Sequence, residues 1–344
     1  MKPIRVLIVD DSPTVQSVLT SVLTGAVDIE VVGTASDAFE AKDLILKKTP
    51  DVITLDVEMP RMDGITFLKR LMGYRPVPVI MISSYTRENS RRTLEALDAG
   101  AVDFVAKPGG DVRIGLRKLG NEITAKIRAA ARAKVKPALP FGKSQIPSVA
   151  KIKSSDEKIV AVGASTGGTR AIHTLLRAMP FNVNGIAIVQ HMPARFTKAF
   201  AQHLDAVLPM RIKEAEDGDR LDRGKVVVAP GGWHLEVEKD PQGYYVRLQD
   251  GRPVKHQRPS VDVLFKSVAR AAGCNSVGVL LTGMGEDGAA GLLAMKEAGA
   301  FTIAQDEATS VVYGMPAAAI ERDAAEVVAA LDDMADIVLS ALQL

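Results

Sequence analysis

Residues 6–12 read VLIVDDS, an apolar run that ends at two aspartates and a serine, and Pro13 follows. A serine side chain caps the free amides at the start of a helix, and proline fits the first helical position. The stretch therefore predicts a buried strand, then a loop that carries Asp10 and Asp11, and then a helix that begins after Ser12.

The sequence around this stretch alternates apolar runs with segments of helical periodicity. We predict strands at residues 6–9, 30–33, 52–55, 77–82 and 103–106. Strands that alternate with helices are typical of βαβ units, which build a parallel sheet. A last amphipathic helix is predicted over residues 112–133.

The same alternation resumes at residue 158, so the second half is also expected to be a doubly wound α/β domain. Strands are predicted at residues 159–162, 186–189, 226–228, 277–281 and 301–304, with an inserted hairpin at 236–249. Residues 132–157 contain three prolines and few large apolar side chains, which is typical of a flexible linker. We therefore divide the chain into domains 1–131 and 158–344, joined by the linker 132–157.

Length and composition limit the possible functions. The 344 residues are enough for two domains, and 47% hydrophobic with 24% charged residues indicates a globular protein. A net charge of +2 gives no support for a nucleic-acid-binding role. The single cysteine, Cys274, excludes an internal disulfide and a cysteine zinc cluster, and suits a reducing compartment. No apolar run approaches the ~18 residues of a membrane span, so we expect a cytoplasmic protein without membrane insertion.

Three aspartates and a lysine are predicted to meet at the carboxyl edge of the first sheet, where functional groups of α/β proteins gather. Asp10 and Asp11 follow the first strand, Asp56 ends the third, and Lys107 follows the fifth. Carboxylates held close together repel one another unless a divalent cation and an ammonium group compensate them. We expect Asp10, Asp11 and Asp56 to hold Mg²⁺. The alternative is that each aspartate is a helix cap or a turn former.

This arrangement suits phosphoryl transfer to Asp56. In that scheme Ser83, at the end of the fourth strand, donates a hydrogen bond to a phosphoryl oxygen, and Lys107 neutralises the added charge. The motifs VLIVDDS, LDVEMPRMDG, MISS and DFVAKP resemble the response-regulator receiver domain, a flavodoxin-like fold. The resemblance implies phosphorylation of Asp56 by a histidine kinase. It also implies that Ser83 and Phe104 transmit the change to a distant face.

Residues 159–168 read IVAVGASTGG, a buried strand that ends in a glycine-rich turn. Residues 163–167 fit the pattern G-x-S-x-G, in which flanking glycines allow a tight turn that exposes the serine hydroxyl of Ser165. The following amides lie at a helix N-terminus, which favours an oxyanion. The same turn could instead hold the pyrophosphate of a dinucleotide. No acidic residue follows the next strand to bind a ribose, which disfavours the dinucleotide.

His191 and Asp287 are predicted to complete a catalytic triad with Ser165, because both follow strands of the second sheet. A serine hydroxyl needs an imidazole to take its proton, and the imidazole needs a carboxylate to fix its tautomer. Alternatives stay open: Asp287 could cap a helix that begins near Gly288. The rival bases and acid are His173 and His203 on helix faces, His256 in a loop, His234 after a strand, and Asp306 after another.

Long motifs extend across the second domain, namely GASTGG, HMPARFTKAFAQHL, VVVAPGG, RPSVDVLF, TGMGEDGAAGL and QDEATSVVYGMP. They resemble the catalytic domain of chemotaxis protein-glutamate methylesterases, the CheB family. The resemblance implies a serine esterase that hydrolyses glutamate methyl esters on methyl-accepting chemoreceptors and deamidates certain receptor glutamines. From loop position, we expect the amides of Thr166 and Met284 to stabilise the oxyanion.

A switch joined by a linker to an enzyme suggests regulation, with the unphosphorylated receiver covering the esterase cleft and phosphorylation of Asp56 relieving it. Two functions of other classes compete with this interpretation. A DNA-binding response regulator would need a helix-turn-helix and a basic patch, and we find neither pattern in the sequence. A scaffold without catalytic activity would tolerate the loss of Ser165.

Overall fold

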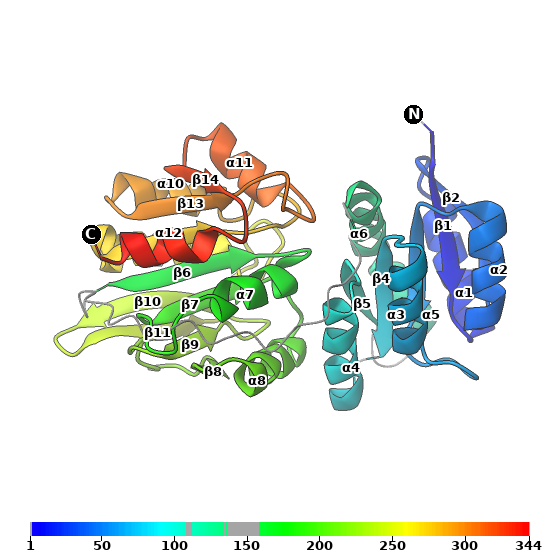
Figure 1. Cartoon of the computed structure of the whole chain (residues 1–344), viewed down its shortest axis with the longest axis horizontal. Coiled ribbons are helices and arrows are strands. Elements are labelled where there is room, and N and C mark those ends of the chain that lie inside the picture. The colour runs from blue at the N-terminus through cyan, green and yellow to red at the C-terminus, as the bar shows by residue number, and fades with distance from the viewer. Residues whose placement is uncertain (1, 85, 108–111, 134, 136–157, 344) are drawn as a thin grey trace. The chain divides into compact units, whose positions relative to one another are not determined.

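The computed structural model describes residues 2–84, 86–107, 112–133, 135 and 158–343 of the chain. The chain divides into two compact units, Met1–Gly142 and Lys143–Leu344 (Figure 1). Most of the predicted linker, 132–157, lies outside the described residues, and its limits stay a prediction. Within the described residues, no helix is long and apolar enough to cross a membrane.

The first unit contains the predicted parallel sheet, with strands in the order β2-β1-β3-β4-β5. Its strands are β1 (Ile4–Val9), β2 (Ile29–Ala35), β3 (Val52–Asp56), β4 (Val79–Ser84) and β5 (Asp103–Lys107). Strand β1 lies between β2 and β3, so the strand order reverses beside it. Ligands of such sheets bind at the carboxyl ends next to this reversal. The loop after β1 and the end of β3 therefore occupy the expected position for a site.

Helix caps in the first unit follow the sequence closely. The helices before the last strand are α1 (Pro13–Thr24), α2 (Ala38–Lys48), α3 (Gly64–Tyr74) and α4 (Arg87–Asp98). The Ser12 hydroxyl accepts a hydrogen bond from the Val15 amide at 3.4 Å, and Pro13 is the first helical residue, as predicted. The Asp63 carboxylate caps α3 in the same way, accepting from the Ile65 and Thr66 amides.

The helix predicted over residues 112–133 is two helices, so this prediction is wrong in one respect. Helix α5 (Val112–Lys118) stops before Leu119, and α6 (Gly120–Arg132) begins at Gly120. Glycine is a weak helix former, which permits the break. A Cβ atom at residue 120 would lie 3.3 Å from Cγ1 of Val22, so the glycine also allows α6 to pass close to α1.

The second unit contains a seven-stranded parallel sheet in the order β14-β13-β12-β6-β7-β9-β8. Its strands are β6 (Ile159–Ala164), β7 (Ile186–Gln190), β8 (Arg211–Glu214), β9 (Lys225–Val228), β12 (Ser276–Leu280), β13 (Phe301–Gln305) and β14 (Val327–Ala329). The predicted hairpin is confirmed as antiparallel β10 (His234–Asp240) and β11 (Gly243–Gln249). The edge strands β8 and β14 were not predicted, because they are only four and three residues long.

Six helices accompany this sheet among the described residues: α7 (Gly168–Arg177), α8 (Phe196–Val207), α9 (Val261–Ala271), α10 (Ala289–Glu297), α11 (Met315–Glu321) and α12 (Met334–Ala341). Helix α9 is a central element, since Val261, Leu264, Phe265 and Val268 are fully buried in the core. A Cβ atom at Gly291 of α10 would lie 2.7 Å from the Phe265 Cβ, so α9 and α10 pack closely. This packing fixes the N-termini of both helices.

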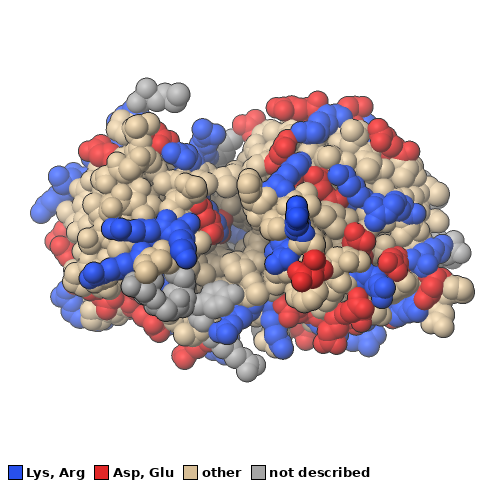
Figure 2. All heavy atoms as spheres, turned by 180° about the vertical axis from the view of Figure 1, so that it is seen from behind, with Lys and Arg blue, Asp and Glu red and all other residues tan. Residues whose placement is uncertain are grey.

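Two surface features complete the description. Cys274 lies in the short turn Gly273–Asn275 and is exposed. On the face drawn in Figure 2, acidic and basic side chains are interspersed on both units, in keeping with the near-neutral net charge of +2.

Candidate functional site

The first unit brings the predicted acidic residues together at the carboxyl edge of its sheet. Carboxylate oxygens of Asp10, Asp11 and Asp56 lie within 4.8 Å of one another. The Lys107 ammonium, from the end of β5, lies 2.9 Å from Oδ2 of Asp10 and 2.7 Å from Oδ2 of Asp56. Two of the three carboxylates thus share one lysine, and three carboxylates beside a single ammonium group leave this cluster with a net negative charge.

Burial raises the pKa of Asp56 to about 6, and the nearby carboxylate of Asp10 adds to the effect, although Lys107 opposes it. Burial also raises the pKa of Asp10. The pKa of Lys107 is raised as well, because the two carboxylates outweigh the opposing effect of burial. A hard divalent cation such as Mg²⁺ prefers carboxylate oxygens and would relieve this repulsion, so the residues present fit the predicted metal.

Ser83 and Phe104 lie on neighbouring strands behind this cluster, and both are buried. The Ser83 hydroxyl oxygen lies 2.7 Å from the hydroxyl oxygen of Thr93 in α4, so it links β4 to that helix. The Lys126 ammonium lies 5.2 Å from the centre of the Phe104 ring. The roles expected of Ser83 and Phe104 in signal transmission stay predictions.

In the second unit, backbone hydrogen bonds bring the predicted triad segments to one edge of the sheet. The Ser165 amide donates to the Thr282 carbonyl at 3.1 Å, and the His191 amide donates to the Ala164 carbonyl at 3.1 Å. Strand β6 lies between β7 and β12, so the loops after these three strands meet. The side-chain amide of Gln190 also donates to the carbonyls of Ser165 and His191, at 2.9 and 3.2 Å.

Two glycines after Ser165 are required by close packing. Gly167 has φ of +77°, and a Cβ there would lie 2.6 Å from the Val311 side chain. A Cβ at Gly168 would lie 2.2 Å from Oε1 of Gln190. Larger residues would therefore force the turn open and move the serine. The two glycines therefore allow the tight turn that the sequence pattern predicts after Ser165.

His191 and Asp287 form the contact on which the site depends. Nε2 of His191 lies 2.8 Å from Oδ2 of Asp287, and their side chains are 5% and 2% exposed. A carboxylate can only accept, so Nε2 carries the proton. Nδ1 of His191 is buried and has no hydrogen-bond partner among the described residues. This nitrogen therefore has the free lone pair that a general base needs.

The Asp287 carboxylate accepts four hydrogen bonds, two on each oxygen. Oδ2 accepts from His191 Nε2 and from the Val261 amide at 2.7 Å, and Oδ1 accepts from the Ser260 hydroxyl at 2.8 Å and the Asp262 amide at 3.1 Å. Burial alone would raise the pKa of Asp287, but the hydrogen bonds from His191, Ser260 and Val261 outweigh it and hold that pKa below its usual value.

Asp287 caps a helix, but not the helix that the alternative interpretation assigned to it. The capped helix is α9, which lies earlier in the chain. Helix α10, which begins after Gly288, is capped by Asp262 of α9, whose Oδ1 accepts from the Gly288 and Gly291 amides at 3.0 and 2.7 Å. The two aspartates therefore cap each other's helix, and Asp287 contacts His191 in addition.

The Ser165 hydroxyl lies at this edge without a hydrogen bond to the His191 ring. Such contacts often form only when substrate is bound, so the catalytic role of Ser165 stays a prediction. Thr166 is buried, and its carbonyl accepts from the Thr282 hydroxyl at 3.1 Å. Met284 is 38% exposed, and its amide has no backbone partner among the described residues. The oxyanion roles of Thr166 and Met284 also stay predictions.

The rival residues have other contacts or positions. His234 is buried; its Nε2 donates to the Arg252 carbonyl at 3.0 Å, and its Nδ1 accepts from the Ser260 amide at 3.2 Å. Asp306 accepts from the Thr309 amide at 2.9 Å and forms a local turn. The remaining histidines are His173 in α7, His203 in α8 and His256 in an exposed turn. Among the histidines, His191 is the one that contacts Asp287.

Comparison with known families identifies the family of each unit. The CheB methylesterase family matches residues 160–338, and the response regulator receiver domain matches residues 6–116. The chain belongs to the CheB methylesterase family. A CheB relative from Bordetella bronchiseptica, named protein-glutamate methylesterase/protein-glutamine glutaminase, is 51% identical over 99% of this chain and 98% of its own. A relative of the same name from Geobacter metallireducens, numbered 1, is 50% identical over 97% of this chain and 94% of its own.

A solved CheB structure resembles the second unit. The catalytic domain of Thermotoga maritima CheB methylesterase has a TM-score of 0.52 and 36% identity, and the match covers 53% of this chain and 97% of that one. The predicted fold class, two α/β units of which one is a receiver, is therefore confirmed.

Sequence reasoning missed three residues around the candidate triad. Ser260 and Asp262 donate hydrogen bonds to Asp287, and Gln190 donates to the carbonyls of Ser165 and His191. The signal for the first two was present in RPSVDVLF, where a serine and an aspartate stand at a helix start. Gln190 directly precedes His191. Nothing local in the sequence says which distant group each of them contacts.

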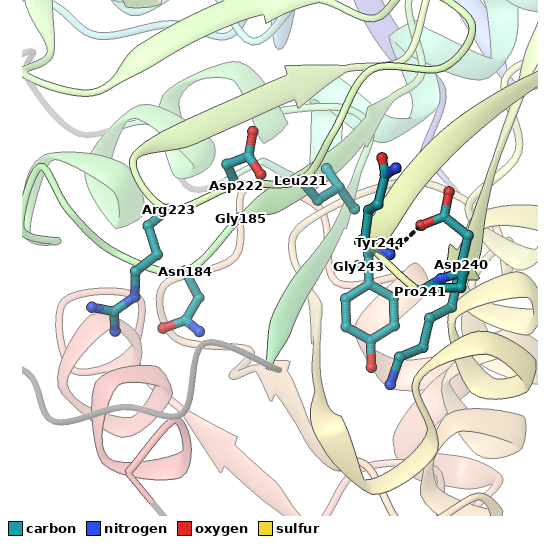
Figure 3. A pocket seen from close by; sticks show the side chains of 11 residues that line it. Asn184, Gly185, Leu221, Asp222, Arg223, Asp240, Pro241, Gly243 and Tyr244 are labelled. Carbon is teal, nitrogen blue, oxygen red and sulfur yellow. Dashed lines mark hydrogen bonds between the residues drawn. The ribbon is translucent and has the colours of Figure 1, made fainter.

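A polar pocket of about 460 Å³ lies at the opposite edge of the same sheet (Figure 3). Its wall is formed by Asn184 and Gly185 before β7, by Leu221, Asp222 and Arg223 before β9, and by the β10–β11 hairpin. Figure 3 shows Asn184 and Arg223 on one side and Tyr244 and Asp240 on the other. None of the candidate triad residues lines it.

Proposed function

We propose that this chain is a serine esterase that hydrolyses glutamate methyl esters of methyl-accepting chemoreceptors and is activated by phosphorylation. The observation that carries the proposal is the 2.8 Å contact of His191 with a fully hydrogen-bonded Asp287, beside the Ser165 turn. The names of the CheB relatives give the substrate class. The same proposal places the chain in the cytoplasm.

The reaction uses each triad residue at a stated atom. Ser165 Oγ attacks the ester carbonyl while Nδ1 of His191 takes the hydroxyl proton, and that proton leaves with methanol. Asp287 stays ionised and stabilises the imidazolium. Water, activated by the same nitrogen, then cleaves the acyl-serine and releases the glutamate carboxylate. The amides of Thr166 and Met284 stabilise the oxyanion of both steps.

Ser165→Ala tests this proposal. The substitution is expected to reduce methanol release from methylated receptor membranes by more than about 1000-fold, because the nucleophile is lost. Ser340→Ala is the matched control, since Ser340 is an exposed serine of α12 whose hydroxyl donates to the Asp336 carbonyl. Circular dichroism of both variants checks folding. Methanol release by a folded Ser165→Ala variant at the rate of the control would refute the assignment.

A second activity, deamidation of receptor glutamines, is favoured by the glutaminase part of the relatives' name. The chemistry differs only in the leaving group, which is ammonia instead of methanol. Ammonia release from receptors that carry glutamine at the modified sites measures it. Loss of both activities in Ser165→Ala is the expected result, and ammonia release that survives in that variant would assign deamidation to another site.

Regulation acts through Asp56, which accepts a phosphoryl group from a histidine kinase of the chemotaxis pathway. Asp10, Asp11 and Asp56 would hold Mg²⁺, which supplies charge neutralisation for the transfer. Ser83 and Lys107 then contact the phosphoryl oxygens, and Phe104 responds to the change. The domains 1–131 and 158–344 and the linker 132–157 belong to this proposal.

The test of regulation is methanol release with and without a small-molecule phosphodonor and Mg²⁺. The donor is expected to raise the rate of the whole chain, and Asp56→Asn is expected to abolish that increase. A fragment that begins near Lys158 should exceed the unphosphorylated whole chain in rate. A phosphodonor effect of the same size in Asp56→Asn would exclude Asp56 as the acceptor.

A further inference from the structure

His234 and Ser260 lie outside the triad but are joined to it by hydrogen bonds. His234 begins β10, and Ser260 directly precedes α9. Both are buried, with exposed fractions of 3% and 0%. The chain of contacts runs from the Arg252 carbonyl through His234 to the Ser260 amide, and from the Ser260 hydroxyl to Asp287. Two hydrogen bonds therefore separate the His234 ring from the carboxylate that contacts His191.

Ser260 occupies the position of a helix cap but does not act as one. A serine at this position usually accepts a hydrogen bond from an amide of the first helical turn. No such bond forms here, because Asp287 accepts from the first two amides of α9 instead. The Ser260 hydroxyl is free to donate, and it donates to Oδ1 of Asp287 at 2.8 Å. Its local capping role is replaced by a contact with the candidate triad.

The tautomer of His234 follows from its two partners. A carbonyl oxygen only accepts, so Nε2 carries the proton that goes to Arg252. Nδ1 is therefore unprotonated and accepts from the Ser260 amide. This contact holds the backbone of Ser260 at the point where the chain enters α9. The same residue, Ser260, thus donates its amide to Nδ1 of His234 and its hydroxyl to Oδ1 of Asp287.

We propose that Ser260 and His234 are positioning residues that hold the Asp287 carboxylate in the orientation that contacts Nε2 of His191. Ser260 acts directly through its hydroxyl, and His234 acts through the Ser260 amide. The expected effect on kcat rests on the proposed function. The expected effect on the His191–Asp287 contact does not depend on it.

Two substitutions of His234 separate the contact with Ser260 from the contact with Arg252. Asparagine places its side-chain oxygen where Nδ1 stands, so His234→Asn keeps an acceptor for the Ser260 amide and loses the Arg252 contact. Glutamine places its amide nitrogen near the position of Nε2, so His234→Gln keeps the Arg252 contact and loses the acceptor. If His234 acts mainly through its contact with Arg252, glutamine should be the better replacement. If His234 acts by positioning Asp287, asparagine should be the better replacement.

The experiment measures methanol release and the downfield imidazole N–H proton resonance of His191, assigned by its loss in His191→Asn, in the full chain. His234→Asn is expected to keep kcat within about threefold of the unsubstituted chain. His234→Gln and Ser260→Ala are expected to lower kcat about ten- to a hundredfold with little change in KM, because a hydrogen bond to a charged group is lost or misplaced. The N–H resonance should shift or broaden in these two variants and persist in His234→Asn.

Several results would overturn the inference. It fails if His234→Gln retains as much activity as His234→Asn, or if Ser260→Ala leaves both the N–H resonance and kcat unchanged. Ser260→Ala removes a single oxygen atom and should still fold. It therefore tests the positioning of Asp287 if His234→Gln does not fold. If the unsubstituted chain releases no methanol, the proposed function fails, while the N–H resonance still tests the positioning of Asp287.

Discussion

Asp56 and Asp287 are both buried at the carboxyl edge of a parallel sheet, one in each unit, with exposed fractions of 6% and 2%. Burial raises the pKa of Asp56 to about 6, whereas the pKa of Asp287 is below its usual value. The difference lies in the neighbours: Asp56 shares Lys107 with another carboxylate, while Asp287 accepts four hydrogen bonds. The supply of donors, not burial, decides the state of a buried carboxylate.

The two environments suit different tasks. An aspartate short of donors gains from a cation and can present an oxygen to a phosphoryl group. An aspartate with both oxygens fully occupied is held in one orientation, which suits a group that only has to orient a histidine. The comparison can be tested at either site.

Asp287→Asn should have the largest effect. We expect kcat for methanol release to fall about 10³- to 10⁴-fold, because the amide no longer fixes the imidazole tautomer. The free energy of unfolding of the second unit should fall by about 1–3 kcal/mol as donors of α9 lose their acceptor. Steady-state kinetics and denaturant unfolding measure the two effects.

The pH dependence of this loss follows from the lowered pKa of Asp287. The carboxylate stabilises the folded state at neutral pH, and this contribution disappears as the pH falls through the lowered pKa. The stability difference between the unsubstituted chain and Asp287→Asn should therefore narrow as acid protonates this carboxylate, at a pH below the usual range of an aspartate. A constant difference from neutral to acidic pH would contradict the comparison.

Asp56→Asn should have the opposite effect on stability. The folded-state pKa of Asp56, about 6, lies above the ordinary aspartate value of 3.8, so the folded state binds the proton more tightly and loses stability as the pH rises between these values. In metal-free protein at neutral pH, the substitution should stabilise the first unit by about 1–3 kcal/mol. Hydrogen exchange of the β3 amides measures it, and a less stable variant would show that Lys107 satisfies Asp56 fully.

Asp262→Ala tests how much of the effect of Asp287→Asn comes from the loss of a helix cap. It removes the acceptor for the Gly288 and Gly291 amides, so unfolding of the second unit should become easier by about 1–2 kcal/mol. Its kcat should fall much less than that of Asp287→Asn, because the Asp262 side chain does not contact His191. Equal kinetic losses in the two variants would mean that the caps alone explain the effect of Asp287.

Mg²⁺ binding to the receiver should show the smallest effect. Below about pH 6 the affinity is expected to fall about tenfold per pH unit, because a proton on Asp56 must leave before the cation binds. Calorimetric titration with Mg²⁺ at about pH 5 and about pH 7.5 measures the change. An affinity that is the same at both pH values would indicate that Asp56 is already ionised throughout.

The fold was largely predictable because its signals are local. Apolar runs gave the central strands, and Ser12 with Pro13 gave the start of α1. The edge strand β8 was missed because its sequence, RIKE, is four residues long and contains a single apolar residue. The break before Gly120 was missed because it depends on the approach of α1, which the periodicity of α6 does not reveal.

The candidate sites were predictable to the same extent. Strand ends identified Asp56, Ser165, His191 and Asp287, since parallel strands bring their carboxyl ends together. Ser260 was missed because its partner, Asp287, stands 27 residues later in the chain. Whether Asp287 caps the next helix or an earlier one depends on tertiary packing, which local sequence does not encode.

Asp287 caps α9 and Asp262 caps α10, and this arrangement affects how the second unit unfolds locally. Neither helix can fray at its first turn without withdrawing an aspartate from the other, so their amide protons should become exposed in one concerted event. The Asp287 carboxylate, which contacts His191, is held by the same capping hydrogen bonds and would be released in the same event. The reacting groups can therefore loosen only when a large part of the core does, and thermal inactivation and global unfolding should coincide.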